Sequence, residues 1–153
     1  MLDILSSSRM LEGLDESILK KISVFSKIEK YKPNVTILEE DSSDDCDLFI
    51  VSAGRVKIFV SSKYFSGESE DSKAIYTVNP GDFFGEMSCI VKKRRSASAV
   101  TMTDCEIVRI NGKKFIQLME NDSEAGFQIL KKLYETLYDR IQNSNFMLRN
   151  LLI

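Results

Sequence analysis

Short runs of β-forming residues, separated by turn signals, fill the middle of this sequence and limit the folds open to it. The runs are rich in Val, Ile, Phe and Tyr, and turns such as Ala53-Gly54 and Asn79-Pro80-Gly81 punctuate them. The predicted strands are Ser26–Tyr31, Val35–Leu38, Leu48–Ser52, Val56–Ser61, Ala74–Val78, Ala97–Met102 and Glu106–Ile110. Many short strands with regular turns predict a sandwich or a barrel-like roll.

Apolar residues at helical spacing bracket these strands. One helix is predicted over Asp15–Val24, with Asp15 as its N-cap, and a second over Asn111–Glu120. Asp122 or Ser123 opens a longer helix, over about 123–150. The order of helix, strands and helix is that of an α+β fold. The length of 153 residues is that of one domain, which we assign to residues 1–153.

Composition narrows the possible functions. The charge sum, 21 basic minus 23 acidic residues, is −2, which disfavours a protein that binds nucleic acid by charge. Histidine is absent, so catalysis by Ser-His-Asp or Cys-His and metal sites with histidine ligands are excluded. The sequence also lacks a P-loop, a G-x-G-x-x-G motif and acids paired for acid–base work. We therefore expect no enzyme, no metal and no cofactor.

Cysteines and terminal residues indicate the compartment. Cys46, Cys89 and Cys105 lie far apart and form no C-x-x-C, which favours free buried thiols in a reducing compartment. No apolar run reaches the roughly 18–20 residues of a membrane span, and the first ten residues do not resemble a signal peptide. We expect a cytoplasmic protein without membrane contact. Two polar, acidic segments, Asp41–Asp47 and Ser61–Lys73, lack the spacing of a calcium loop and are expected to be solvated surface loops.

The last helix carries an apolar seam whose steps alternate between three and four residues, the spacing of a coiled coil. The seam is Phe127, Leu130, Tyr134, Leu137, Ile141, Ser144, Leu148 and Leu151, with Ile129 and Leu133 beside it. One interpretation is a single amphipathic helix that covers one sheet. The seam runs past the length that a small roll can cover, so we favour pairing with the same helix of a second chain, in a homodimer.

The stretch Asn79–Val100 carries the chemistry. Gly85 allows close approach of the backbone, and Glu86–Val91 has the length of about one helical turn with free N–H groups at its start. Arg95 follows, and arginine binds phosphate through paired charge-assisted hydrogen bonds. A carboxylate beside an anion site suits a ligand that also has hydroxyl donors. The combination indicates a nucleotide with one phosphate near its sugar.

These residues resemble the phosphate-binding cassette of the cyclic nucleotide-binding domain family, whose members include bacterial regulators such as catabolite activator protein and the regulatory subunits of protein kinase A. The cassette reads Phe84-Gly85-Glu86-Met87-Ser88 and then Arg95-Ser96-Ala97. Further segments that match the family are Met10–Leu14, Ser52–Lys57, Pro80–Asp82, Cys105–Ile107 and Lys114-Phe115. The resemblance implies an antiparallel β-roll, a double-stranded jelly-roll-like barrel, with an N-terminal helix, a short cassette helix and a long C-terminal helix.

The resemblance also implies the ligand, a 3′,5′-cyclic nucleotide, with cAMP favoured over cGMP. Glu86 would hold the ribose 2′-hydroxyl and Arg95 would pair with the cyclic phosphate. The other cassette positions implied to contact the ligand are Phe84, Gly85, Met87, Ser88, Ser96 and Ala97. On the long helix, Arg140, Ser144 and Asn145 fall where the dimeric regulators offer polar side chains to the base.

Two features leave alternatives open. Arg94 stands where many family members have proline, inside the basic run Lys92–Arg95, and such a run is also typical of a nuclear localisation or nucleic-acid patch. A loop that balances the phosphate of the ligand is the simpler interpretation. The competing function is a β-roll that binds no ligand and serves only as a dimerisation scaffold. Because the sequence stops soon after the long helix, we expect a sensor module without its own output domain, with a separate effector protein as a candidate partner.

Overall fold

The computed structural model describes residues 1–60 and 74–152. Its elements, in chain order, are α1 (Leu2–Ser7), α2 (Glu16–Val24), β1 (Ser26–Tyr31), β2 (Thr36–Leu38), β3 (Leu48–Ala53), β4 (Val56–Phe59), β5 (Ala74–Val78), β6 (Phe83–Phe84), α3 (Glu86–Val91), β7 (Ser98–Thr101), β8 (Cys105–Ile110), α4 (Gly112–Asn121) and α5 (Ser123–Leu151). No helix in the described ranges has the length and apolar character needed to cross a membrane.

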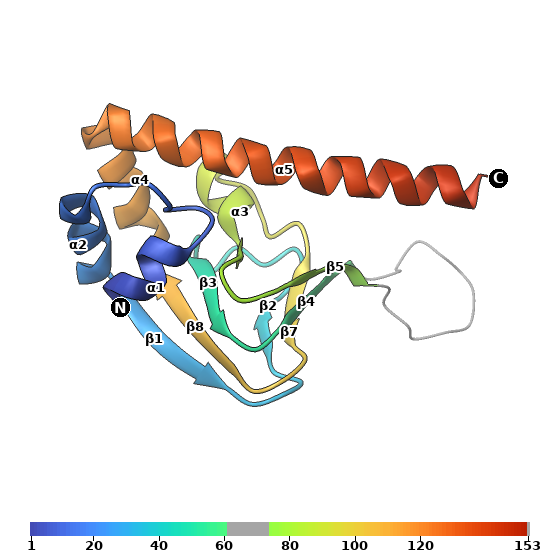
Figure 1. The fold of residues 1–153 in the computed structure, drawn as a ribbon. Coiled ribbons are helices and arrows are strands. Elements are labelled where there is room, and N and C mark those ends of the chain that lie inside the picture. The colour runs from blue at the N-terminus through green and yellow to red at the C-terminus, as the bar shows by residue number, and fades with distance from the viewer. Residues whose placement is uncertain (61–73, 153) are drawn as a thin grey trace.

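Two four-stranded antiparallel sheets form a β-roll (Figure 1). The first sheet has the order β1-β8-β3-β6 and the second has the order β2-β7-β4-β5. Strand β1 pairs with β8 along its whole length, from Ser26 opposite Ile110 to Tyr31 opposite Cys105. Within the described ranges the ladders stay in two sheets and do not close into one hydrogen-bonded barrel. The α+β fold with an antiparallel roll is therefore confirmed.

The predicted strands match the observed ones with differences at their ends. Strands β1 and β5 have the predicted bounds. Strand β7 begins at Ser98 rather than Ala97 and ends at Thr101 rather than Met102. Helix α1 and the two-residue strand β6 were not predicted, since both are too short to show a period. The predicted loop Ser61–Lys73 lies outside the described residues.

Strand β3 is buried on both faces and organises the core. Leu48 and Ile50 pack with the helices, whereas Phe49 and Val51 pack inside the roll. The first sheet therefore lies between the helical layer and the second sheet, which explains why β3 reads as a continuous apolar run rather than an alternating one. Inside the roll, the rings of Phe49 and Phe84 stack with centroids 5.0 Å apart. This stack fixes β6, and with it the start of α3.

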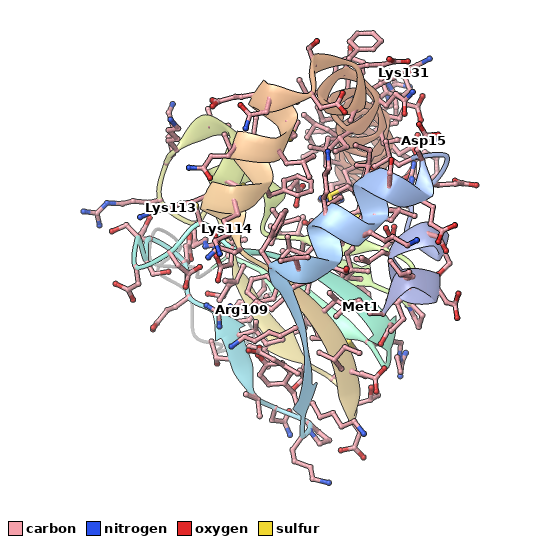
Figure 2. All side chains as sticks on the ribbon, turned by 90° about the vertical axis from the view of Figure 1, so that its left-hand side faces the viewer. Met1, Asp15, Arg109, Lys113, Lys114 and Lys131 are labelled. Carbon is pink, nitrogen blue, oxygen red and sulfur yellow. The ribbon has the colours of Figure 1, made fainter. Side chains whose placement is uncertain are left out.

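The helices begin at the predicted caps. The Asn111 side chain accepts a hydrogen bond from the Lys114 N–H at 3.0 Å, and the Asp122 side chain accepts one from the Ala125 N–H at 3.1 Å. Seen from the helical end of the molecule, Lys113 and Lys114 lie at the start of α4, above Arg109 of β8 (Figure 2). These caps place α4 and the first turns of α5 against the roll.

Helix α5 crosses the top of the molecule and continues beyond α3 (Figure 1). Ile129 and Leu133, which lie beside the seam, are buried in the core. From Ile141 to Leu152 every residue is exposed, and Leu148 and Leu151 are 55% and 80% exposed. The apolar seam therefore does extend past the part of the helix that this chain covers.

Candidate functional site

A small cavity of about 40 Å³ lies between the second sheet and α3. Its walls are Leu38, Ile58, Tyr76, Phe84, Gly85, Glu86, Met87, Ser88, Arg95, Ser96, Ala97 and Ala99. All of the predicted cassette residues are among them, and Leu38, Ile58, Tyr76 and Ala99 supply apolar and aromatic surface from the strands.

Position 85 requires glycine, because its backbone conformation and its close neighbours leave no room for a side chain. Its φ of +84° lies in the left-handed region, where side chains are rarely found. A Cβ atom at this position would lie 3.1 Å from Arg95 Nη1, 3.1 Å from the Asp47 carbonyl oxygen and 3.2 Å from the Phe49 ring. The glycine therefore lets the guanidinium of Arg95 lie against the backbone at the start of α3.

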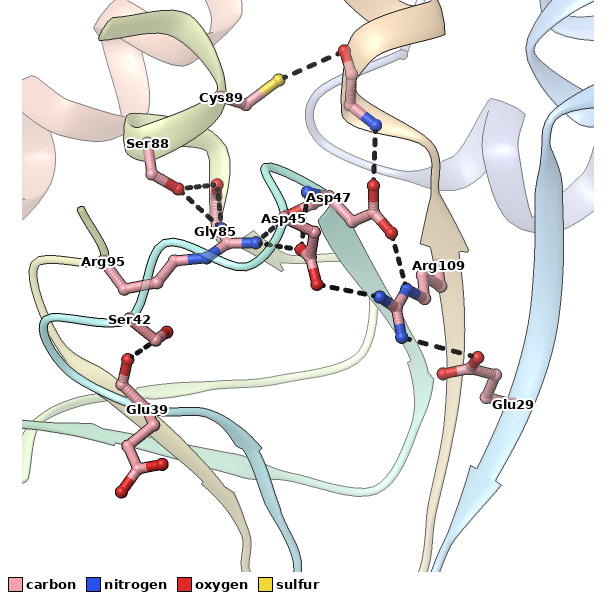
Figure 3. A network of polar contacts seen from close by, with 11 residues as sticks. Glu29, Glu39, Ser42, Asp45, Asp47, Gly85, Ser88, Cys89, Arg95 and Arg109 are labelled. Carbon is pink, nitrogen blue, oxygen red and sulfur yellow. Dashed lines mark hydrogen bonds and ion pairs between the residues drawn. The ribbon is translucent and has the colours of Figure 1, made fainter. Parts of the chain in front are cut away.

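The Arg95 side chain is 4% exposed and is held by four hydrogen bonds (Figure 3). Nη1 donates to the Gly85 carbonyl oxygen at 2.9 Å and to Ser88 Oγ at 2.7 Å. Nη2 donates to Asp45 Oδ1 at 2.7 Å and to the Asp47 carbonyl oxygen at 2.8 Å. A cation is thus fixed in the cavity wall in one orientation.

Arg109 binds the two carboxylates of this network, those of Asp45 and Asp47 (Figure 3). Its Nε donates to Asp47 Oδ2 at 2.8 Å and its Nη2 donates to Asp45 Oδ2 at 3.1 Å. Burial alone would raise the pKa of Asp45, but hydrogen bonds from the Asp47 N–H and Arg95, with the charges of both arginines, lower it below its usual value. Asp45 is therefore a carboxylate shared by two guanidinium groups.

This network corrects the interpretation of Asp41–Asp47 as a merely solvated loop. The segment is a surface loop, but two of its carboxylates hold arginines that lie some fifty and more positions later in the sequence. Asp47 Oδ1 also accepts the Gly112 N–H at 3.0 Å, which ties the loop to the start of α4. The acidic composition of the loop indicated its charge, but no spacing in the sequence predicted that Arg95 and Arg109 would be its partners.

Glu86 forms an ion pair with Arg140 of α5. Arg140 Nη1 donates to Glu86 Oε1 at 2.8 Å, and Nη2 donates to the Phe83 carbonyl oxygen at 2.8 Å. The guanidinium carbon also lies 4.4 Å from the centroid of the Tyr76 ring. Arg140, predicted on the basis of helical position alone, is thus connected to the cassette, while Tyr76 is a site residue that sequence reasoning missed.

The structure places the neighbouring Arg94 and two of the predicted helix residues away from the cavity. Arg94 is exposed, in contrast to Arg95, and its Nη1 donates a hydrogen bond to the Asp41 carbonyl oxygen at 3.2 Å. Ser144 and Asn145 are exposed on α5, beyond Arg140, and do not line the cavity. One chain therefore brings together the cassette and Arg140 but not these two polar residues of the helix.

Comparison with known proteins agrees with this geometry. The model of the cyclic nucleotide-binding domain family matches residues 28–122. The cAMP-activated global transcriptional regulator CRP of Haemophilus influenzae is 30% identical over 151 residues, which are 97% of this chain and 62% of that protein. The cGMP-dependent 3′,5′-cGMP phosphodiesterase A of Dictyostelium discoideum is 28% identical over 106 residues, 69% of this chain and 11% of that protein.

Solved structures show the same fold. A cyclic nucleotide-binding domain from Methylobacillus flagellatus superposes with a TM-score of 0.76 at 21% identity, over 94% of this chain and 77% of that one. The chain spans only part of the length of the two curated relatives above. The match of the family model over most of the described strands, together with the regulator aligned over nearly the full length, shows that this chain belongs to the cyclic nucleotide-binding domain family.

Proposed function

We propose that this chain binds a 3′,5′-cyclic nucleotide, cAMP in preference to cGMP, and acts as a sensor module rather than an enzyme. The observation that carries the proposal is the placement of one buried cation and one buried carboxylate, Arg95 and Glu86, on the wall of a single cavity. In this assignment Arg95 pairs with the cyclic phosphate and Glu86 accepts the ribose 2′-hydroxyl. Backbone N–H groups from Gly85 to Met87 and at Ala97, with the Ser96 hydroxyl, complete the phosphate contacts.

The contacts within the protein leave both charged groups able to take a ligand. Among the described residues, the partners of Arg95 use Nη1 and Nη2 and leave the Nε–H free, and Arg140 uses only Oε1 of Glu86. The four hydrogen bonds of Arg95 hold its guanidinium in place before a ligand arrives, which lowers the entropic cost of binding. Arg140 lies over Tyr76 at the edge of the same cavity, where we place the base.

Calorimetry with both nucleotides tests the ligand. We expect heat with cAMP and weaker binding of cGMP, since the relative aligned over nearly the whole chain is a cAMP-activated regulator. The Ser96 hydroxyl could serve a guanine amino group, so tighter binding of cGMP would reverse the assigned preference. The absence of heat with either nucleotide at high micromolar concentration would refute the proposed function.

A pair of adjacent arginines provides a matched test of the site. Arg95→Ala removes a charge-assisted contact worth about 1.5–3 kcal/mol, which corresponds to roughly 10- to 150-fold in affinity. Arg94→Ala should change affinity little, because Arg94 is exposed. Glu86→Gln should cost less than Arg95→Ala, because the amide oxygen still accepts a hydroxyl proton. Circular dichroism must first show that each variant is folded, and equal losses from both arginines would contradict the assignment.

A dimerisation scaffold without a ligand is the second candidate function, and one observation favours it. Four donors of Arg95 and one oxygen of Glu86 already have partners within the chain. Thermal unfolding with and without cAMP separates the two functions, since a ligand at 100 times its dissociation constant stabilises the folded state by about 2.7 kcal/mol. An unchanged melting temperature would favour the scaffold.

We further propose that α5 pairs with its copy around a two-fold axis. The support is the exposed part of the seam, in which Leu137 and Ile141 are 38% and 49% exposed. Fully burying such a side chain contributes roughly 1.5–3 kcal/mol. In the dimer, Ser144 and Asn145 would reach the base, one of them from each protomer.

Sedimentation tests the dimer. The double variant Leu137→Glu, Ile141→Glu places charges against their copies and should yield a monomer with weaker nucleotide binding, since coupling between dimerisation and binding is reciprocal. A wild-type monomer of 17.4 kDa, with and without nucleotide, would end this part of the proposal. We also place the protein in the reducing cytoplasm, in keeping with its three free cysteines.

A further inference from the structure

The basic run Lys92–Arg95 is divided by the fold into two parts. Arg95 is buried in the cassette, whereas Lys92, Lys93 and Arg94 are exposed. The exposed part lies along a second, open groove of about 710 Å³ between the 43–46 loop, the end of α3 and one side of α4. Lys113, at the start of α4 (Figure 2), also lines this groove. We call this surface the basic groove.

Most of the cations of the basic groove have no carboxylate partner. Among the described residues, Lys92, Lys93 and Lys113 form no ion pair, and Arg94 donates only to a carbonyl oxygen. Of the three acids that line the groove, Asp45 is already held by two arginines, which leaves the carboxylates of Asp44 and Glu120. Four cations therefore face two available carboxylates, on a chain whose net charge is −2.

The floor of the groove favours a polypeptide over a nucleic acid. Ile116 and Cys46 are half-buried there and offer apolar surface, and Gln117 adds an exposed amide. Asp44 and Glu120 at the rim would repel a phosphodiester backbone, which carries a charge at every residue. A peptide can alternate acidic side chains, which meet the lysines, with an aliphatic side chain that packs on Ile116 and with backbone N–H groups that face the carboxylates.

We propose that the basic groove docks an acidic polypeptide segment of a partner protein. The groove is distinct from the nucleotide cavity, but the two share Ser88 of α3, which lines both. A partner seated here would touch the element that carries the cassette. The docking itself does not depend on nucleotide binding, so either proposal can fail alone.

Fluorescence anisotropy with a labelled peptide of repeated Glu-Glu-Leu units tests the proposal on the whole chain. We expect binding to the wild type that weakens as salt rises. The double variant Lys93→Glu, Lys113→Glu removes two attractions and adds two repulsions, and should weaken binding by about tenfold or more. The matched control is Lys30→Glu, Lys32→Glu, which makes the same charge change on exposed lysines at the end of β1 and just after it, and should stay within about twofold of the wild type.

Three results would overturn the proposal. The first is a wild type that does not bind the peptide even at low salt. The second is an equal loss of binding in the control variant, which would show attraction to overall charge rather than docking in the groove. The third is tighter binding of single-stranded oligothymidine than of the peptide through Lys93 and Lys113, which would assign the groove to nucleic acid.

Discussion

Removing the Arg140 guanidinium should destabilise the fold as well as alter the ligand site. The pair with Glu86 is largely buried, with side chains 18% and 11% exposed, and hydrogen bonds to charged groups contribute about 1.5–3 kcal/mol. Stacking on Tyr76 adds about 0.5–1 kcal/mol. Because leucine keeps part of the packing, we expect Arg140→Leu to lower the free energy of unfolding by about 2–4 kcal/mol. For a chain of this length that is a fall in Tm of roughly 4–16 °C.

Urea unfolding at a fixed protein concentration measures this change, with Arg149→Leu as the matched control. Arg149 is exposed in the last turn of the same helix and should shift the free energy by less than about 0.5 kcal/mol. A cycle with Glu86→Gln should give a coupling energy of about 0.5–3 kcal/mol. If Arg140→Leu costs no more than the control, or if the cycle shows no coupling, the contact does not hold α5 to the cassette.

Three further predictions test other parts of the structure. Gly112→Ala should cost roughly 3 kcal/mol or more in urea unfolding, because the new Cβ would lie 2.0 Å from the Cys46 carbonyl oxygen. Burial and the hydrogen bond to Glu29 raise the pKa of Tyr31 to about 12, so its contribution to stability is complete below about pH 10 and is lost as pH rises toward 12. Tyr31→Phe should flatten that part of the pH profile of unfolding. Burial, followed by the neighbouring Cys46 thiol, raises the pKa of Cys89 to about 12, so iodoacetamide at pH 8 should alkylate Cys46 and spare Cys89, as peptide mass spectrometry will show.

Most of the fold could be predicted because it depends on local patterns. The β-runs with their turns, the caps at Asn111 and Asp122, and the apolar faces of the helices are properties of neighbouring residues, and each was placed to within a few positions. Helix α1 and strand β6 were missed because six and two residues carry too little periodicity. The antiparallel roll was predicted, but the division of the described strands into two sheets was not, since it depends on how strand edges meet in space.

The same distinction applies to the site, where contacts between residues close in sequence could be predicted and contacts between distant segments could not. The cassette could be predicted because its residues are close in sequence and the backbone at Gly85 demands glycine. The side chains that hold it in place could not be predicted, because Asp45, Arg109 and Tyr76 reach the cassette only through the pairing of strands. Arg140 was placed near the ligand by helical position, but its ion pair with Glu86 depends on the angle at which α5 crosses the roll, and no spacing encodes that angle.

Helix α5 can act as a lever, because its first part is anchored in the core and its last part is exposed in one chain. Its 29 residues span about 43 Å at 1.5 Å per residue. Ile129 and Leu133 form the anchored end, and Arg140 is the last point of attachment to the cassette. From Arg140 to Leu151 the rod extends about 16 Å, so a tilt of about 10° at the attachment moves the far end by about 3 Å. A shift at the cassette that is too small to disturb the core would thus move the C-terminal end of α5 by about the width of a side chain.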